Sequence, residues 1–180
     1  MANVQVLDKV FEPYLTDAEI SVAITGIAAK INEDYKDKKP LFISILNGSF
    51  MFASDLFKKL SIEAEICFIK LASYKGTKSS GQVVTAIGLD IDLFNRHVVV
   101  LEDIVDTGKT LNVFLPQLGY QQPASLKIAA LLHKPEASIY PLQIDYLGFS
   151  IPNKFVVGYG LDYNGFGRNI PEIYKLIGED

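Results

Sequence analysis

Apolar residues follow a helical pattern near the amino terminus of the chain. From Ile20 to Ile31 they recur at positions i, i+3, i+4 and i+7, which places them on one face of an α-helix. The segment Thr16-Asp17-Ala18-Glu19 comes just before this pattern and has the spacing of a capping box. We therefore predict a helix over about residues 17–35.

The middle of the chain alternates between short apolar runs, typical of buried strands, and segments typical of helices. Pro40 precedes the β-branched run 41–46, and a helix is expected to begin at Gly48-Ser49. Another helix is expected after Thr110, where Pro116 must end or kink it because proline lacks the backbone donor. The other predicted strands lie at 64–71, 83–89, 97–101, 125–134, 146–149 and 155–158.

This alternation favours an α/β fold in which a central, mostly parallel twisted sheet is flanked by helices. No linker divides the sequence, so we expect a single domain over residues 1–180. Its core would span about 38–140, and a small hood would come from the N- and C-terminal segments 1–15 and 141–180. The N-terminal helix is expected to join the C-terminal tail in this hood beside the sheet. The polar segment 73–82 holds two glycines and no periodicity, and we predict a long mobile loop there.

Composition excludes several classes of protein. The chain has 180 residues, and its one cysteine, Cys67, cannot form an intramolecular disulfide. The net charge of −4 argues against nucleic acid as the main partner. Met1 is not followed by a basic segment and an apolar run, and no apolar run is long enough to span a bilayer. We therefore expect a cytoplasmic protein with no membrane partner.

The most informative stretch is VVVLEDIVDTGKTL, residues 98–111. It resembles the end of a P-loop, but that motif needs a glycine where Asp103 stands, five residues before Gly108. Backbone N–H groups of residues 106–110 can instead form a concavity at a helix start, which suits a single terminal phosphate. The neighbouring acids suit sugar hydroxyls and a hard cation such as Mg²⁺. The stretch therefore predicts a site for a ribose 5-phosphate with a metal on its hydroxyls.

These residues resemble the phosphoribosyl-diphosphate (PRPP) motif of type I phosphoribosyltransferases. More narrowly, the chain resembles the hypoxanthine–guanine phosphoribosyltransferase family. The other segments stand in that family's order, namely LNGSF at 46–50, SYKGTKSSGQV at 73–83, LLHKP at 131–135 and IPNKFVVGYGLDYNGFGR at 151–168. The resemblance implies purine salvage, in which 5-phosphoribosyl passes from PRPP to N9 of hypoxanthine or guanine, giving IMP or GMP and pyrophosphate. It also implies Mg²⁺ as cofactor, PRPP and a 6-oxopurine base as ligands, and a homodimer or homotetramer.

The resemblance further assigns roles to residues around PRPP. Asp106 would be the catalytic general base. The ribose and 5-phosphate would be bound by Glu102, Asp103, Asp106, Thr107, Gly108, Lys109 and Thr110. Pyrophosphate would be bound by Leu46, Asn47, Gly48, Ser73, Tyr74 and Arg168. The loop 73–82 would close over the site and exclude water. Some relatives have lysine where Asn47 stands.

The purine would lie between the later segments. Lys134 would donate to the exocyclic oxygen at C6, which an ammonium can do for a 6-oxopurine but not for the amino group of adenine. Phe155 would stack on the base and Val156 would meet its edge through the backbone. Asp162 would contribute through water to a second Mg²⁺, so that the metal residues would be Glu102, Asp103 and Asp162.

Two other functions remain open from the sequence. One is a phosphoribosyltransferase for xanthine or uracil. The other is a non-catalytic regulator that senses PRPP or nucleotide on the same fold and binds RNA. Asp106, Lys134 and the full polar loop speak against the regulator.

Overall fold

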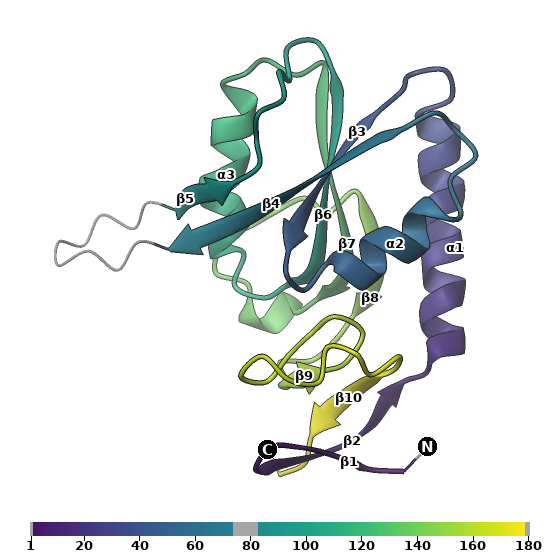
Figure 1. Cartoon of the computed structure of the whole chain (residues 1–180), viewed down its shortest axis with the longest axis vertical. Coiled ribbons are helices and arrows are strands. Elements are labelled where there is room, and N and C mark those ends of the chain that lie inside the picture. Colours follow the sequence, from purple (N-terminus) through teal and green to yellow (C-terminus); the bar gives the residue numbers. More distant parts are fainter. Residues whose placement is uncertain (1, 74–82, 179–180) are drawn as a thin grey trace, which may run out of the picture.

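The computed structural model describes residues 2–73 and 83–178 and contains two sheets. The larger sheet has the strand order β5-β4-β3-β6-β7-β8, and every neighbouring pair is parallel except β4 and β5. Its strands are β3 (Leu41–Leu46), β4 (Glu65–Ser73), β5 (Val83–Ile87), β6 (His97–Val105), β7 (Ser125–His133) and β8 (Tyr146–Ser150). The predicted α/β fold with a central, mostly parallel sheet is therefore confirmed (Figure 1).

Helices cover both faces of this sheet because the strands are apolar on both sides. On β6, Val99 and Leu101 belong to the apolar cluster that contains α1 (Asp17–Asp34) and α2 (Phe50–Phe57). Val98 and Val100 point the other way, into the cluster of α3 (Lys109–Gly119). Figure 1 shows α3 on one side of the sheet and α1 with α2 on the other. A short 3₁₀ turn, η1 (Pro135–Ala137), follows β7.

The smaller sheet forms the hood below the carboxyl ends of the core strands. It has the order β1-β2-β10-β9 and is antiparallel throughout. Its strands are β1 (Val4–Val6), β2 (Lys9–Leu15), β9 (Val156–Val157) and β10 (Ile173–Leu176). The two ends of the chain thus meet in one hood sheet (Figure 1). The sequence pattern predicted one of these strands, at 155–158, which corresponds to β9, whereas β1, β2 and β10 were not predicted.

Several details differ from the sequence-based predictions. The N-terminal helix packs on the core sheet and not in the hood, since its buried side chains join those of β3 and β6. Strand β8 belongs to the core sheet, although it lies within the segment 141–180 assigned to the hood. Pro116 does not end α3, which continues to Gly119. Strand β6 extends through Val105, so Glu102 and Asp103 lie inside the strand and not after it.

Two further observations concern the surface and the loop 73–82. Residues 74–82 of that predicted loop lie outside the described part of the chain.

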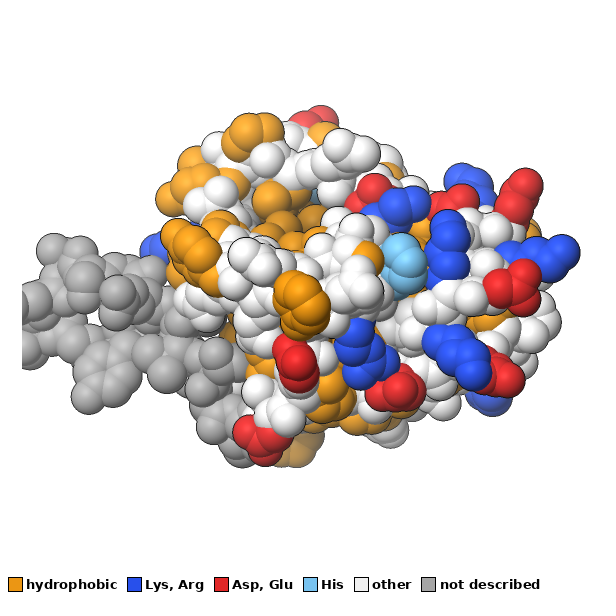
Figure 2. Space-filling view, turned by 90° about the horizontal axis from the view of Figure 1, so that it is seen from above, with side chains coloured by type: hydrophobic (Ala, Val, Ile, Leu, Met, Phe, Trp, Pro, Cys, Tyr) orange, Lys and Arg blue, Asp and Glu red, His pale blue; other side chains and the backbone are white. Residues whose placement is uncertain are grey.

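No helix of the described ranges is both long and apolar enough to cross a membrane. At the end of the molecule opposite the hood, basic and acidic side chains intermingle on one side of the view (Figure 2).

Candidate functional site

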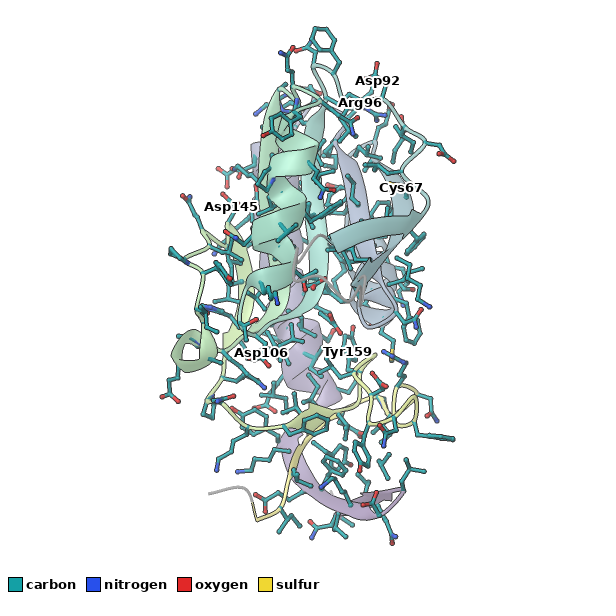
Figure 3. All side chains as sticks on the ribbon, turned by 90° about the vertical axis from the view of Figure 1, so that its left-hand side faces the viewer. Cys67, Asp92, Arg96, Asp106, Asp145 and Tyr159 are labelled. Atoms are coloured by element: carbon teal, nitrogen blue, oxygen red, sulfur yellow. The ribbon has the colours of Figure 1, made fainter. Side chains whose placement is uncertain are left out.

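The predicted site residues gather where the core sheet meets the hood. Strands β3, β6 and β7 are parallel neighbours, so their carboxyl ends reach the same edge of the sheet. Figure 3 places Asp106, which follows β6, at this level of the molecule. Tyr159 lies at the same level, in the loop of residues 158–168, which we call the hood loop. Gly48 and Asp103 are close to the hood loop, because Gly160 lies against the Gly48 carbonyl and the charge of Arg168 acts on Asp103.

The turn after β6 has the conformation of an anion-binding site. Gly108 caps α3 with a positive φ of 77°, and a Cβ there would lie 3.0 Å from the carbonyl oxygen of Tyr140. The Thr107 carbonyl accepts hydrogen bonds from the N–H groups of Ile139 and Tyr140, which hold the turn in place. The first N–H groups of a helix have no acceptor within it, so the start of α3 can offer donors to an anion; in this structure the Lys109 N–H donates to the Thr107 hydroxyl at 3.3 Å. A cavity of about 90 Å³ lies here, lined by Glu102 and residues 104–111.

Glu102 lies in β6, before this turn, and its carboxylate is buried, which is unusual for a charged group. Its Oε2 atom is buried and has no hydrogen-bond partner among the described residues. Burial raises its pKa well above the ordinary value, and the charge of Asp103 raises it further. An unpartnered buried carboxylate oxygen is costly unless a donor or a cation meets it. Glu102 is therefore suited to a cation or to hydroxyl groups that come with a ligand.

Asp103 is packed against the loop that follows β3. Burial raises its pKa to about 6, although hydrogen bonds from the backbone N–H groups of Ile104 and of Asp103 itself lower it, as does the charge of Arg168. A Cβ on Gly48 would lie 1.6 Å from Asp103 Oδ2. Position 48 therefore accommodates a side chain only if Asp103 moves, and the carboxylate lies directly against the backbone of the loop.

The loop 46–49 is held by buried polar side chains that the sequence did not reveal. The peptide bond between Leu46 and Asn47 is cis. Ser49 is fully buried, and its hydroxyl donates to the carbonyl of Ile45 and shares a hydrogen bond of 2.7 Å with the hydroxyl of Ser44. Serine in an apolar strand is an ambiguous signal, so this anchoring pair is visible only in the structure.

Asp106 and Lys134 come together from the ends of two adjacent strands. Lys134 Nζ lies 3.2 Å from Asp106 Oδ2, and the lysine is 6% exposed whereas the aspartate side chain is 48% exposed. The Lys134 N–H donates to the carbonyl of Val105, and the Ser138 hydroxyl contacts the carbonyls of both site residues. The pair therefore has fixed backbones, a buried cation and an accessible carboxylate.

Phe155, which is predicted to stack on the purine, lies in an aromatic group of the hood. Phe155 is 37% exposed, and its ring lies 5.9 Å from that of Tyr163 and 6.3 Å from that of Phe11. Val156 is buried in β9. A partly exposed ring next to the buried β9 backbone has the character of a stacking surface.

Asp162 and Arg168 bind each other in this structure. Arg168 Nη2 lies 2.7 Å from Asp162 Oδ1, and Arg168 Nη1 donates to the carbonyl of Gly160 at 2.7 Å. Asp162 Oδ2 also accepts from the N–H of Gly165. Within the described ranges, no three His, Cys, Asp or Glu residues are grouped so as to hold a metal. Asp162 is thus not brought together with Glu102 and Asp103 as one ligand set.

The remaining predicted residues are only partly described. Ser73 ends β4, where it pairs with Val83 of β5. Tyr74 lies outside the described residues. Sequence reasoning also missed Tyr159, whose flanking glycines, Gly158 and Gly160, both have positive φ. A tyrosine between two glycines was the available signal for a special backbone at this point.

Comparison with known proteins places this site in a family. The family model described as "Phosphoribosyl transferase domain" matches residues 13–164. The chain is 40% identical over 166 residues to the hypoxanthine phosphoribosyltransferase of Buchnera aphidicola subsp. Schizaphis graminum, covering 91% of this chain and 94% of that protein. It is 37% identical over 174 residues to the hypoxanthine-guanine-xanthine phosphoribosyltransferase of Tritrichomonas foetus, covering 96% and 95%. A crystal structure of a hypoxanthine-guanine phosphoribosyltransferase from Bacillus anthracis superimposes with a TM-score of 0.87 at 32% identity, covering 92% of this chain and 98% of that one.

Proposed function

The chain belongs to the phosphoribosyl transferase family, and we propose that it transfers the 5-phosphoribosyl group of PRPP to N9 of hypoxanthine or guanine. The products are the corresponding purine nucleotide and pyrophosphate. The observation that carries this proposal is the contact between Asp106 and Lys134 at 3.2 Å, beside the helix start that suits a phosphate. The names of the relatives support the choice of 6-oxopurine bases.

In this proposal the PRPP molecule extends along the carboxyl end of β6. The N–H groups of residues 107–110 hold the 5-phosphate, because a helix N-terminus favours an anion. Glu102 and Asp103 accept hydrogen bonds from the ribose hydroxyls. The backbone of residues 46–49 holds the pyrophosphate. Asn47 and Arg168 lie at the same end of the site, and Arg168 would have to exchange its contacts with Asp162 and Gly160 to reach it.

The same residues fit a bound Mg²⁺. Glu102 and Asp103 offer the hard carboxylate oxygens that this ion prefers, and Glu102 Oε2 is buried without a partner among the described residues. When bound with PRPP, the ion neutralises charge on the departing pyrophosphate. Asp162 would act through water, since its carboxylate is already paired.

The purine is held and deprotonated by the pair at the ends of β6 and β7. Lys134 donates to the oxygen at C6 and excludes adenine, because an ammonium has no acceptor. Asp106 accepts the ring proton as the new bond to N9 forms, a step that typically contributes about 10²–10⁴-fold to the rate. Phe155 stacks on the base and Val156 meets its edge through the backbone. Xanthine is a second candidate substrate, because it too carries the C6 oxygen and one relative is named for it.

The test is release of pyrophosphate from PRPP and Mg²⁺ with hypoxanthine, guanine, xanthine, adenine and uracil in parallel. We expect activity on the first two and none on adenine or uracil. Asp106→Asn should lower kcat by about 10²–10⁴-fold while KM for PRPP changes little, because the amide keeps the shape but cannot take the proton. Lys134→Met should remove the preference for hypoxanthine over adenine. The exposed-site variants Asp90→Asn and Lys30→Ala are matched controls. Binding of PRPP without turnover on any base would favour the regulator instead.

A further inference from the structure

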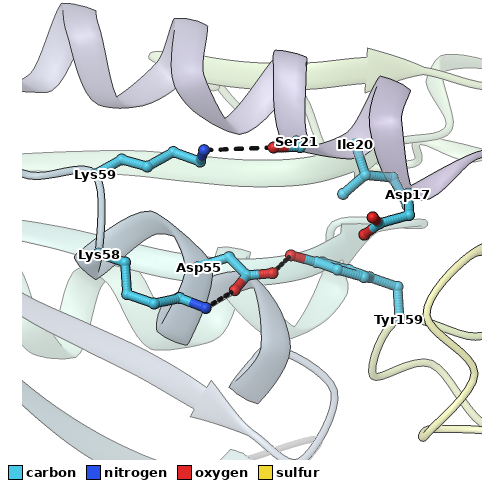
Figure 4. Close-up of a pocket in the computed structure, with 7 residues that line it drawn as sticks. All are labelled: Asp17, Ile20, Ser21, Asp55, Lys58, Lys59 and Tyr159. Carbon is cyan, nitrogen blue, oxygen red and sulfur yellow. Dashed lines mark hydrogen bonds and ion pairs between the residues drawn. The ribbon is translucent and has the colours of Figure 1, made fainter.

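Tyr159 joins the hood to helix α2 by a hydrogen bond that the proposed reaction has not used. Its side chain is 1% exposed and belongs to the same apolar cluster as Phe52 and Leu56 of α2. Its hydroxyl donates to Asp55 Oδ2 at 2.5 Å. Figure 4 shows the two side chains pointing at each other from the hood loop and from α2. The contact links residues that are far apart in sequence but frame the same site.

The direction of this hydrogen bond follows from the environment of the phenol. Burial raises the pKa of Tyr159 far above its ordinary value, and its hydrogen bond to Asp55 raises the pKa further. The hydroxyl therefore keeps its proton near neutral pH and is the donor. Asp55 uses its other oxygen for Lys58 at 2.5 Å, whose side chain is 69% exposed. Only the tyrosine side of Asp55 is thus tied to the hood.

The residue after Tyr159 touches the predicted pyrophosphate loop directly. A Cβ on Gly160 would lie 2.0 Å from the carbonyl oxygen of Gly48, so the two backbones are in contact. Arg168 Nη1 donates to the Gly160 carbonyl, and the Tyr159 N–H donates to the carbonyl of Ile170 at 2.7 Å. The hood loop is therefore held against loop 46–49 at Gly160 and against α2 at Tyr159.

Loop 46–49 leads directly into α2, so the contact at Gly48 and the hydrogen bond to Asp55 both hold the continuous segment 46–57. Tyr159 also has a positive φ of 48°, a conformation that a bulky residue adopts only when its surroundings require it. We propose that Tyr159 and Asp55 are positioning residues that set the separation between the pyrophosphate loop and the purine-binding face of the hood. This inference rests on the proposed function, because it assigns pyrophosphate to loop 46–49.

A cavity of about 370 Å³ lies beside the hydrogen bond between Tyr159 and Asp55. It is lined by Asp17, Ile20, Ser21, Asp55, Lys58, Lys59 and Tyr159. Side chains therefore do not fill the space between α1, α2 and the hood loop on this side. Without the hydroxyl, the packing of the Tyr159 ring and the contact of Gly160 with Gly48 remain, but the loop loses its hydrogen bond to α2, and we expect the diphosphate end of the site to be held less rigidly.

The experiment compares Tyr159→Phe, Asp55→Ala, the double variant and Asp55→Asn, with Lys58→Ala as the matched control. Phenylalanine keeps the buried ring, and asparagine keeps an oxygen that can accept from the phenol. We expect Tyr159→Phe and Asp55→Ala each to raise KM for PRPP by up to about tenfold, because PRPP must then order the hood loop without a hydrogen bond that is worth about this factor. The double variant should be no worse than either single one. Asp55→Asn should recover most of the affinity, and Lys58→Ala should match the parent.

A second measurement separates this inference from the proposed function. Amide hydrogen exchange in residues 46–50 and 158–162 should speed up in Tyr159→Phe relative to the parent, with or without turnover. An inactive parent protein with faster exchange in the variant would remove the proposed function and keep the mechanical link. The inference would be overturned by the following result with an active parent protein. The Tyr159→Phe variant would show a lower Tm, but exchange at these segments would be unchanged and KM for PRPP would stay within about twofold of the parent value.

Discussion

The buried carboxylate of Asp103 makes the stability of the ligand-free protein depend on pH in a direction opposite to that of most surface acids. Its pKa is raised from 3.8 to about 6, chiefly by burial. The folded state therefore binds this proton more tightly than the unfolded state. The contribution of the group to stability is complete below about pH 3.8 and is lost as pH rises through about 6.

The size of this effect follows from the two pKa values. The difference of about 2.2 corresponds to about 3 kcal/mol at 1.36 kcal/mol per pH unit, and about 2 kcal/mol of it falls between pH 4.5 and 7.5. Asp103→Asn keeps the shape and removes the charge, so the variant should be more stable than the parent by about 3 kcal/mol at pH 7.5 and by about 1 kcal/mol at pH 4.5. Loss of the Asp103 charge also relieves Glu102, whose pKa that charge raises, which acts in the same direction.

The assay is urea denaturation of both proteins at several pH values between 4.5 and 7.5, with EDTA and without PRPP. Asp90→Asn serves as the control for removing an exposed carboxylate. The reasoning would be refuted if the difference in unfolding free energy between the parent and Asp103→Asn stayed constant within about 0.5 kcal/mol across this pH range. Such a result would mean that Asp103 has the same pKa in the folded and unfolded states.

Two further substitutions probe the packing of the site and the start of α1. Gly48→Ala places a Cβ 1.6 Å from Asp103 Oδ2, so we expect a loss of about 1–3 kcal/mol in unfolding free energy and a higher KM for PRPP. Gly26→Ala is the control, because a Cβ there meets nothing within 4 Å, and it should leave KM unchanged. Equal kinetics in the two variants would contradict the close contact between Gly48 and Asp103. Thr16→Ala removes the acceptor of the Glu19 N–H in the capping box. It should lower the unfolding free energy by about 1 kcal/mol without altering the kinetics. A change in KM with no change in stability would contradict this prediction and would indicate that the cap serves the site.

The sequence by itself determined the elements whose pattern is local and strong. The helix over Asp17–Asp34 was predicted within one residue of its end, because an amphipathic repeat and a capping box agree. The run 41–46 was predicted as a strand with the bounds that β3 has, because it is apolar, β-branched and preceded by proline. The turn at 106–110, for which we propose phosphate binding, was also predicted from the sequence as the start of a helix, because the groups that would donate are backbone N–H groups of consecutive residues. These features depend on neighbours in the chain, which the sequence shows directly.

Only the tertiary structure decided where those elements pack. The N-terminal helix was expected in the hood, yet its apolar face is buried on the core sheet. An amphipathic pattern shows that one face of a helix is buried but not which element covers it. The hood strands from both ends of the chain pair across a long separation that no local pattern encodes. The packing of Gly48 on Asp103 and the bond from Tyr159 to Asp55 depend on contacts of the same kind. Such contacts arise from the summed packing of the whole chain, and so the geometry of the site becomes visible only once the chain is folded.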